Sequence, residues 1–569
     1  MVAKSQHIKD IDKYVNDVIA GRKLANKWEI LACKRYKKDL KRSRTTGFEY
    51  EFDRQKAEHA IKFIETLPHT KGKWATLTGK DRLIRLEGWQ KFIIGSIFGW
   101  VHKKTRLRRF RVADVYVPRK NGKSVIAAGI GLYMLTADGE FGAEVYCGAT
   151  TEKQAWEVFK PAKLMAERSP MFRRHYGVEV TARFLTRPRD GSVFAPVIGK
   201  PGDGASPSCS IVDEFHEHDD DELYDTMITG MGAREQPLML VITTAGSNIA
   251  GPCYQKQRDL EKVLEGVFEN DQLFGVIYTI DKEDDWKAES SLIKANPNYG
   301  VSVGKDFLRN QIRDAEQSPR KINTVKRKHF NIWVGAKDAW MNMDLWNAQG
   351  DSTLQREDFV NDPCNKALDL SSKLDITADV DMFTRVIDGK DHYYVFGKYY
   401  LPEDRVNEDG KEHYQGWVND GHLITTDGNV IDYQTIEDNA AADGKNYQIE
   451  QVGYDPWGAT DLAQRLQDSH GMTVVEIPQT TKYLSEPMKW VESMVLAGRF
   501  HHDNNPVLSW MISNVVSKED ANENVYPRKD GKENKIDGAV ATIMAMLLSM
   551  KEESEEGPSV YEERGIIAF

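Results

Sequence analysis

The sequence predicts an α/β protein with two successive domains, each built on its own β-sheet. Residues 110–116 alternate and β-branch like a strand, residues 125–135 are apolar and alanine-rich like a helix, and a short loop joins them. A second apolar run, residues 208–212, ends in two carboxylates, as a buried parallel strand does at its exposed end. After residue 364 the pattern changes to three consecutive strands typical of antiparallel pairing.

The loop at residues 117–124 ends in glycine, lysine and serine, which is the pattern of a phosphate-binding P-loop. Backbone N–H groups at the start of the helix would face the phosphates, Lys123 would reach the β and γ oxygens, and Ser124 would ligate Mg²⁺. Val117 stands where the usual first glycine falls. Taken alone, the pattern fits an ordinary lysine-rich surface loop equally well. The other loop residues predicted to bind the nucleotide are Lys120, Asn121 and Gly122.

The two carboxylates after residues 208–212 are Asp213 and Glu214. Asp213 can hold Mg²⁺ through water, and Glu214 can polarise the water that attacks the γ-phosphate. The alternative is a strand that ends in a solvated acidic loop, because more acidic residues follow. A P-loop upstream makes this alternative the weaker one.

Two further segments fit the same site. Residues 238–242 predict a third strand, which ends in Thr243 and Thr244, where a polar sensor would lie beside the γ-phosphate. Gln90 falls just upstream of the P-loop strand, where many motor ATPases use a glutamine to recognise the adenine edge. The start of an amphipathic helix explains Gln90 equally well. Together these segments predict a P-loop NTPase domain with an ASCE-type parallel sheet that hydrolyses ATP with Mg²⁺.

Composition is typical of a soluble globular protein, since 40% of the 569 residues are apolar and 29% are charged. No apolar run is long enough to cross a bilayer, and the first ten residues lack a signal peptide. The five cysteines are scattered without a Cys-x-x-Cys pair, which favours a reducing cytosol and argues against structural zinc. The net charge is −10, but basic clusters at residues 34–44, 103–111 and 320–328 permit binding to a phosphate backbone. Such clusters are more often solvated faces.

Changes of pattern along the chain predict six parts. Helices are expected at residues 8–19, 30–40 and 52–67. The expected parts are a helical N-terminal extension (1–70), the ATPase core (71–250), a helical lid (251–341), a polar aperiodic linker (342–364), a nuclease domain (365–550) and an acidic tail (551–569).

The C-terminal part has the element order of a ribonuclease-H-like fold with a mixed sheet. The expected strands are residues 367–370, 384–387, 392–400 and 451–454, and the expected helices lie near 460–467, 486–497 and 537–548. Asp369 lies inside the first strand, Asp455 closes the fourth, and Asp537 opens the last helix. On this fold the three positions converge on one edge of the sheet, where they would bind two divalent ions, Mg²⁺ or Mn²⁺, for DNA cleavage.

Other residues could supply the metal ligands instead. Asp375, Asp379 and Asp381 lie on or near the same hairpin, and Asp537 could be no more than a helix cap. His501 and His502 could suggest another type of metal site, but no further ligand is suitably spaced.

The combination of motifs strongly resembles the large terminase subunit of tailed double-stranded DNA bacteriophages. The resemblance spans roughly residues 80 to 550. The matching segments are 86–90, 118–124, 148–155, 211–216, 242–246, 368–371, 453–455, 505–507 and 535–539. It implies an ATP-driven motor that moves double-stranded DNA into a procapsid and a nuclease that cuts concatemeric DNA.

The resemblance also implies partners and roles. Arg119 would contact the γ-phosphate, and Thr243 and Thr244 would couple hydrolysis to movement. The chain would form a homo-oligomeric ring on the portal protein of the procapsid, together with a small terminase subunit. It would work in the host cytoplasm, away from membranes, and be absent from the mature virion. A neighbour's arginine would complete each ATPase site, and the candidates are Arg187, Arg189 and Arg234.

Two other functions compete with this one. A helicase-type or repair-type ATPase fused to a nuclease would need a second motor domain, and nothing after residue 245 supplies it. A non-catalytic assembly scaffold would not need Lys123, Ser124, Asp213 and Glu214 together.

Overall fold

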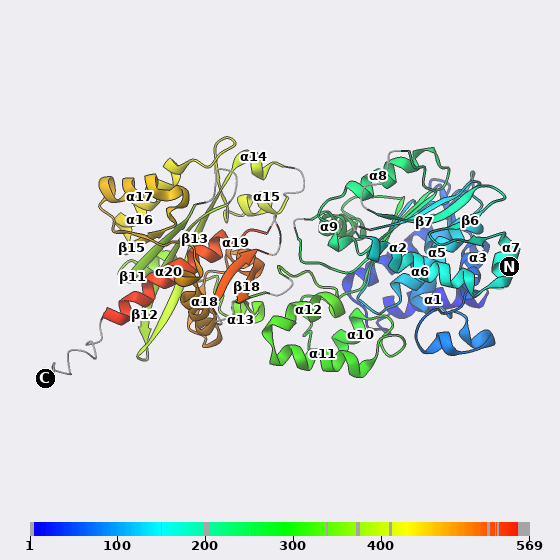
Figure 1. The fold of residues 1–569 in the computed structure, drawn as a ribbon, viewed down its shortest axis with the longest axis horizontal. Coiled ribbons are helices and arrows are strands. Elements are labelled where there is room, and N and C mark those ends of the chain that lie inside the picture. Colours follow the sequence, from blue (N-terminus) through cyan, green and yellow to red (C-terminus); the bar gives the residue numbers. More distant parts are fainter. Residues whose placement is uncertain are drawn as a thin grey trace. The chain divides into compact units, whose positions relative to one another are not determined.

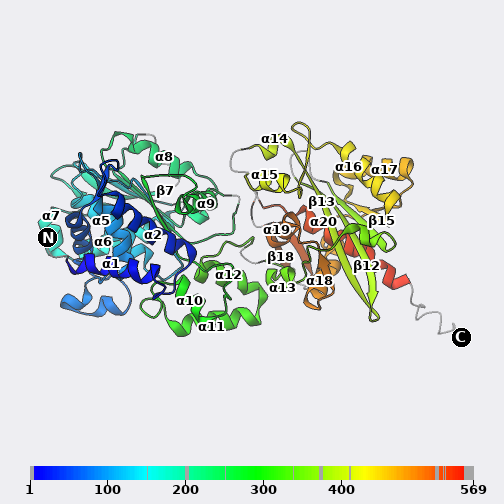
Figure 2. The same cartoon turned by 180° about the vertical axis from the view of Figure 1, so that it is seen from behind.

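The structure is a computed structural model, and it describes residues 5–149, 151–198, 204–249, 251–336, 339–370, 376–408, 412–519, 524–529, 531 and 534–555. The chain divides into two compact units (Figures 1 and 2). The first contains Met1–Gln317 and Val325–Trp333, and the second contains Ser318–Thr324 and Val334–Phe569. Among the described residues, no helix is both long enough and apolar enough to cross a bilayer.

The first unit is built on an eight-stranded sheet of the described residues, in the order β10-β3-β9-β8-β4-β7-β6-β5. Neighbouring strands from β10 to β7 run parallel, and β6 and β5 add antiparallel pairs at one edge. The strands are β3 (Val112–Tyr116), β4 (Glu144–Ala149), β5 (Glu179–Val180), β6 (Leu185–Arg187), β7 (Ser192–Ile198), β8 (Cys209–Asp213), β9 (Leu238–Thr243) and β10 (Leu273–Ile277). All residues of β8 and β9 are buried, as expected for central parallel strands with both faces covered. This confirms the predicted parallel sheet.

Helices pack closely against this sheet. A Cβ atom on Gly131 of α5 (Lys123–Thr136) would come within 2.6 Å of the Phe194 ring, so the helix lies directly on β7. The predicted N-terminal helices are α1 (Gln6–Ile19), α2 (Lys27–Arg42) and α3 (Arg54–Glu65), and α4 (Gly88–Gly99) and α6 (Glu152–Glu167) follow. Buried residues of α1, α2 and α3 share one hydrophobic core with the sheet. The N-terminal helices therefore pack as part of the first unit.

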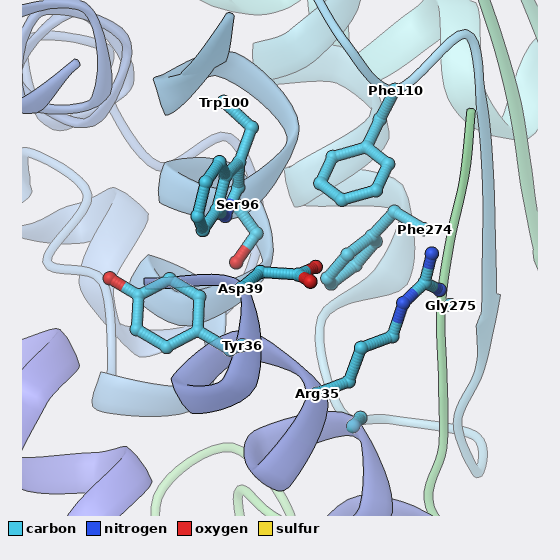
Figure 3. Close-up of a pocket in the computed structure, with 9 residues that line it drawn as sticks. Arg35, Tyr36, Asp39, Ser96, Trp100, Phe110, Phe274 and Gly275 are labelled. Atoms are coloured by element: carbon cyan, nitrogen blue, oxygen red, sulfur yellow. The ribbon is translucent and has the colours of Figure 1, made fainter. Parts of the chain in front are cut away.

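A small cavity lies in the core of this unit (Figure 3). Its lining includes Asp39, Ser96 and Phe110, and its volume of about 20 Å³ suits a single water molecule. Ser96 Oγ is buried there without a hydrogen-bond partner in the structure. Because Phe110 precedes β3 and the P-loop follows it, the cavity lies at the opposite ends of the strands from the nucleotide site.

The segment predicted to be a helical lid contains a strand. Its helices are α9 (Pro252–Glu265), α10 (Glu289–Ala295), α11 (Lys305–Gln317) and α12 (Pro319–Phe330). Between α9 and α10, β10 pairs in parallel with β3, so the expectation of helix throughout residues 251–341 is wrong at this point. Five apolar residues between charged helices are too short for their periodicity to distinguish strand from helix.

The second unit contains a mixed sheet whose main order, among the described residues, is β14-β13-β12-β11-β15-β16, with β17 pairing β13. The strands β11, β12 and β13 pair antiparallel, and β15 and β16 extend the sheet in parallel on the other side of β11, which confirms the ribonuclease-H-like order. The strands are β11 (Pro363–Asp369), β12 (Thr377–Ile387), β13 (Lys390–Pro402), β14 (Ile424–Thr426), β15 (Gln448–Tyr454), β16 (Val474–Glu476) and β17 (Phe500–His502).

Two groups of helices cover this sheet. Leu368 on β11 belongs to a core cluster with residues of α16 (Tyr433–Asn446) and α17 (Pro456–His470). The helix α20 (Asp537–Glu555) packs on β11 and β12 and also contacts α18 (Thr481–Leu496). Smaller elements are α14 (Glu403–Val406), α15 (Glu412–Asn419), α19 (Pro506–Asn514) and a hairpin of β18 (Val515–Glu519) and β19 (Val525–Lys529).

The expected linker at residues 342–364 is also different in the structure. It contains α13 (Met343–Ala348), a 3₁₀ turn (Arg356–Phe359) and the start of β11. Trp346 stacks on His502 with ring centroids 4.4 Å apart, and Phe359 packs on Phe383. The polar composition misled the prediction, because two fully buried aromatic side chains anchor the segment in the second unit.

Candidate ATPase and nuclease sites

The P-loop connects β3 to α5 with two residues in the left-handed conformation. Gly122 precedes α5 with φ 90°, where a glycine carries no Cβ penalty. Lys120 has φ 70° and is exposed, a conformation that is disfavoured for a residue with a side chain. Ser124 lies in the first turn of α5, as a Mg²⁺ ligand of a P-loop would.

The predicted catalytic carboxylates lie at the end of β8, close to the P-loop lysine. Lys123 Nζ donates to Glu214 Oε2 at 3.2 Å. Burial opposes ionisation of Glu214, but the charges of Lys123, His216 and Arg119 outweigh it and lower the Glu214 pKa. Burial, and to a lesser degree the Glu214 charge, raises the pKa of Asp213 to about 7, against the effect of Lys123. Glu214 is therefore ionised, while Asp213 needs a cation to stabilise its charge.

A histidine joins Glu214 to the predicted sensor threonines. His216 Nδ1 lies 3.3 Å from Glu214 Oε2 and 3.0 Å from Thr243 Oγ1. Thr244 Oγ1 donates to the same Glu214 oxygen at 3.5 Å. Glu214 itself has φ 50°, so this network holds a strained residue in place. The sequence pattern gives His216 no predicted role, although it lies only two residues after the predicted catalytic carboxylate.

The sensor loop is also bonded to the P-loop and to the end of α12. Val117 N donates to Thr243 O at 3.0 Å, and Arg119 N donates to Lys328 O at 2.9 Å. Ala245 N donates to Asn331 Oδ1 at 2.5 Å. Asn331 is buried with φ 58° and was not predicted, because no local pattern marks such a distant contact.

Two predicted nucleotide-binding side chains are engaged with the protein. Gln90 Oε1 accepts from Glu87 N at 2.8 Å, and its Nε2 would lie 3.6 Å from a Cβ at Gly122. Gln90 thus caps α4 and faces the P-loop. The Asn121 side chain is fully buried and bonded to Asn296 and Asn298, so it is not available to a nucleotide.

The three candidate arginine fingers differ in their contacts. Arg187 pairs with Asp190 and donates to Thr136 O, and Arg234 pairs with Glu140 and Glu144. Arg189 is exposed in the turn between β6 and β7 and makes no hydrogen bond or ion pair with the described residues. Among the described residues, it is therefore the one of the three candidates without a partner inside the chain.

The three predicted nuclease aspartates meet at one edge of the second sheet. Asp369 ends β11, Asp455 caps α17, and Asp537 begins α20. Burial raises the Asp369 pKa well above its ordinary value, and the charges of Asp537 and Asp455 raise it further. Gln479 opposes this by donating to Asp369 Oδ1 at 2.8 Å. Within the described residues, no three His, Cys, Asp or Glu side chains surround a single metal position.

The rival aspartates belong to a different network. The buried Lys366 Nζ lies 2.5 Å from Asp379 Oδ1 and 2.8 Å from Asp381 Oδ1. Asp443 of α16 accepts from the same lysine at 3.0 Å. The network therefore lies on the α16 face of the sheet, whereas Asp369 interacts with Asp537 of α20. The third rival, Asp375, lies outside the described residues.

The two histidines at the end of β17 make structural contacts. His502 Nε2 lies 2.9 Å from Trp346 O, and His501 Nε2 lies 3.0 Å from His392 Nδ1. Neither belongs to a group of metal ligands among the described residues.

A polar pocket of about 400 Å³ lies beside the nuclease aspartates. Its lining residues are Gln479, Thr480, Thr481, Lys518, Asn524, Tyr526 and Arg528. Tyr526 donates to Gln479 O at 3.1 Å, and its pKa is raised by burial and by the charges of Asp369 and Asp455. The pocket was not predicted. Its basic residues, Lys518 and Arg528, lie on the β18–β19 hairpin, which was not among the expected elements.

These features define a P-loop ATPase joined in one chain to a ribonuclease-H-like nuclease. The family model described as "Terminase large subunit, ATPase domain" matches residues 88–262, and "Terminase large subunit, endonuclease domain" matches residues 268–553. The chain belongs to the terminase large-subunit family. It is an ATPase and an endonuclease.

Relatives cover most of the chain. Protein YmfN of Escherichia coli (strain K12) is 47% identical over 367 residues, which are 63% of this chain and 80% of YmfN. The terminase large subunit of Enterobacteria phage HK97 is 27% identical over 461 residues, 78% of this chain and 88% of that protein. The crystal structure of the HK97 large terminase aligns with a TM-score of 0.43 and 25% identity, over 86% of this chain and 99% of that one.

Proposed function

We propose that this chain is the motor and the nuclease of viral DNA packaging. It would hydrolyse ATP to move double-stranded DNA into a procapsid, and it would cut concatemeric DNA into genome lengths. The main observation behind the proposal is that each of the two units contains its own cluster of charged side chains at the predicted site. Lys123 pairs with Glu214 in the first, and Asp369, Asp455 and Asp537 converge in the second.

In the ATPase site, the ion pair between Lys123 and Glu214 suggests how the nucleotide starts catalysis. The β- and γ-phosphates would compete with Glu214 for Lys123. Glu214 would then be free to orient the attacking water, while His216 and Thr244 hold its carboxylate. The lowered Glu214 pKa supports this role, because the carboxylate must be ionised to polarise water. Bound Mg²⁺ would neutralise phosphate charge, with Ser124 and Asp213 as its protein ligands.

The nuclease aspartates suit hard divalent cations. Their oxygen donors match Mg²⁺ and Mn²⁺. Burial, and to a lesser degree the charges of Asp537 and Asp455, raises the Asp369 pKa, and a bound cation would stabilise the ionised carboxylate. Two such ions, when bound, would activate water and stabilise the leaving 3′ oxygen. Gln479 would orient Asp369 through its hydrogen bond.

DNA would approach the nuclease edge along the β18–β19 hairpin. Lys518 and Arg528 line the pocket beside the aspartates and would contact phosphates. Trp457, two residues after Asp455, is 87% exposed and offers a flat apolar surface to the same substrate. The ring assembly, the portal protein, the small terminase subunit and the host cytoplasm remain part of this proposal.

DNA packaging by purified components tests the proposal. Procapsids carrying the portal protein, the small subunit, ATP and linear duplex DNA are incubated with the chain, and DNA protected from added DNase is measured. The intact chain is expected to protect DNA, whereas Lys123→Ala protects none. Failure of the intact chain to protect DNA in active procapsids would contradict the proposal.

A further inference from the structure

Three asparagines join the P-loop to the segment between α10 and α11. Asn121 Nδ2 donates to Asn296 Oδ1 at 2.9 Å, and Asn121 Oδ1 accepts from Asn298 N at 3.0 Å. Asn298 Nδ2 donates back to Asn121 O at 3.0 Å. Both polar ends of the Asn121 side chain are therefore used by residues far away in sequence.

The same segment supports the strained part of the P-loop. Ser302 Oγ donates to Lys120 O at 2.7 Å, and Asn298 Nδ2 donates to Ser302 Oγ at 3.1 Å. Lys120 has φ 70°, a conformation that persists only when its surroundings fix it. The bond from Ser302 is a contact of that kind.

On its other side, Asn298 reaches the helix that carries Gln90. Trp89 Nε1 donates to Asn298 Oδ1 at 2.8 Å. Asn296 Nδ2 also donates to His329 O at 2.9 Å, next to the segment that bonds Arg119 and Ala245. Asn298 thus contacts two elements, the P-loop and α4, that are expected to touch opposite ends of the nucleotide.

Burial makes these bonds sensitive to substitution. Asn121, Asn296 and Asn298 are all buried, so removing one amide leaves a partner unpaired away from water. Most of the bonds end on the P-loop or on α4.

We propose that Asn296, Asn298 and Ser302 form a lid clamp that positions the P-loop for ATP. Asn298 is a positioning residue that acts through Asn121, Lys120 and Trp89. The lid clamp thereby holds the P-loop and α4 in a fixed relation to each other. This inference concerns the ATPase reaction and does not depend on packaging or on the nuclease metal.

Steady-state ATP hydrolysis by Asn298→Ala is the first test. Loss of hydrogen bonds to the loop that binds phosphates is expected to raise KM for ATP about tenfold and to change kcat by less than about threefold. The matched control is Asn310→Ala, because Asn310 is exposed on α11. The control is expected to keep both constants, and plasmid cutting by both variants is expected to stay normal. An unchanged KM for ATP in Asn298→Ala would overturn the proposal. A loss of plasmid cutting as large as the loss of ATP hydrolysis would also overturn it.

A double-mutant cycle tests whether Asn298 acts through Asn121. Suppose that Asn298→Ala and Asn121→Ala each raise KM for ATP about tenfold. The KM of the double variant is then expected to stay within about twofold of the higher of the two single-variant values. A product of the two effects, about a hundredfold, would contradict the clamp. Trp89→Phe keeps an aromatic ring and removes the Nε1 donor to Asn298. It therefore tests the same contact even if Asn298→Ala fails to fold. Its KM for ATP is expected to rise about threefold, and an unchanged value would count against the link to α4.

Discussion

Lys123 Nζ donates a hydrogen bond to Glu214 Oε2 at 3.2 Å, but replacing each residue should impair ATP hydrolysis for a different reason. Lys123→Ala removes a charge that phosphates need, and we expect it to abolish both nucleotide binding and turnover. Glu214→Ala removes the group that orients water, and we expect turnover to fall at least about a hundredfold while binding persists. Fluorescent-nucleotide titration beside phosphate release measures both. Normal turnover by Glu214→Ala would refute its assignment.

The raised pKa of Asp213 leads us to expect that KM for MgATP depends on pH. Burial raises its pKa to about 7 in the free protein, so the carboxyl is increasingly protonated as the pH falls below 7. Binding of Mg²⁺ with ATP must then displace this proton, so KM for MgATP should rise by up to about tenfold per pH unit well below 7 and level off above pH 8. Initial rates between pH 5.5 and 8.5 measure this. Because Asp213→Asn has no proton to displace, its KM should be high and independent of pH in this range. A flat profile for the parent chain would contradict the role of Asp213.

At the residue scale, sequence pattern indicated the residues that stand at the ends of strands. Lys123, Asp213 and Asp369 follow or end apolar runs, and they lie at the edge of each sheet where the candidate site was predicted. His216, Asn298 and Asn331 were not assigned roles, because side-chain amide and imidazole contacts between distant segments leave no periodic signal. Separating Asp369 from its rivals needed the strand register, which places Asp379 opposite Lys398 and beside the buried Lys366.

At the scale of single elements, we expect the β18–β19 hairpin to bind duplex DNA. Lys518 and Arg528 line the pocket beside the nuclease aspartates, so replacing both with alanine should weaken duplex binding several-fold and reduce its dependence on salt. Lys390→Ala is the matched control, because Lys390 is exposed at the far end of β12 and β13 from the aspartates. Fluorescence anisotropy of labelled duplex at several salt concentrations measures the effect. Equal losses in the control and in the double variant would exclude a DNA-binding role for the hairpin.

Long elements and strands beside a recognised motif were predictable, and short elements without a motif were not. The N-terminal helices follow a clear periodicity, and most of β13 was expected, whereas only residues 384–387 of β12 were predicted as strand. In contrast, β10 has only five residues, and α13 is a short helix in a polar segment that is anchored by Trp346. The stability of these short elements comes from tertiary packing, which local propensity does not encode.

At the scale of the whole molecule, the ATPase should depend on assembly. Arg189 is exposed and unpaired among the described residues, whereas Arg187 and Arg234 are held by nearby carboxylates. We expect isolated chains to hydrolyse ATP slowly and Arg189→Ala to remove only the acceleration gained on assembly. Phosphate release per chain, with and without procapsids, measures this effect. Rates that stay flat on assembly would argue against a ring, and full acceleration of Arg189→Ala would exclude this arginine.

The central claim is that two independent active sites share one chain, and paired assays of plasmid cutting and phosphate release test it most directly. Asp369→Asn, Asp455→Asn and Asp537→Asn each remove one negative charge from the nuclease edge, so each should stop cutting while ATPase activity stays near normal. Lys123→Ala should lose ATPase activity and still cut plasmid with Mn²⁺ in the absence of ATP. The account is contradicted if the three asparagine variants cut as well as the parent, or if ATPase activity falls together with cutting in all three.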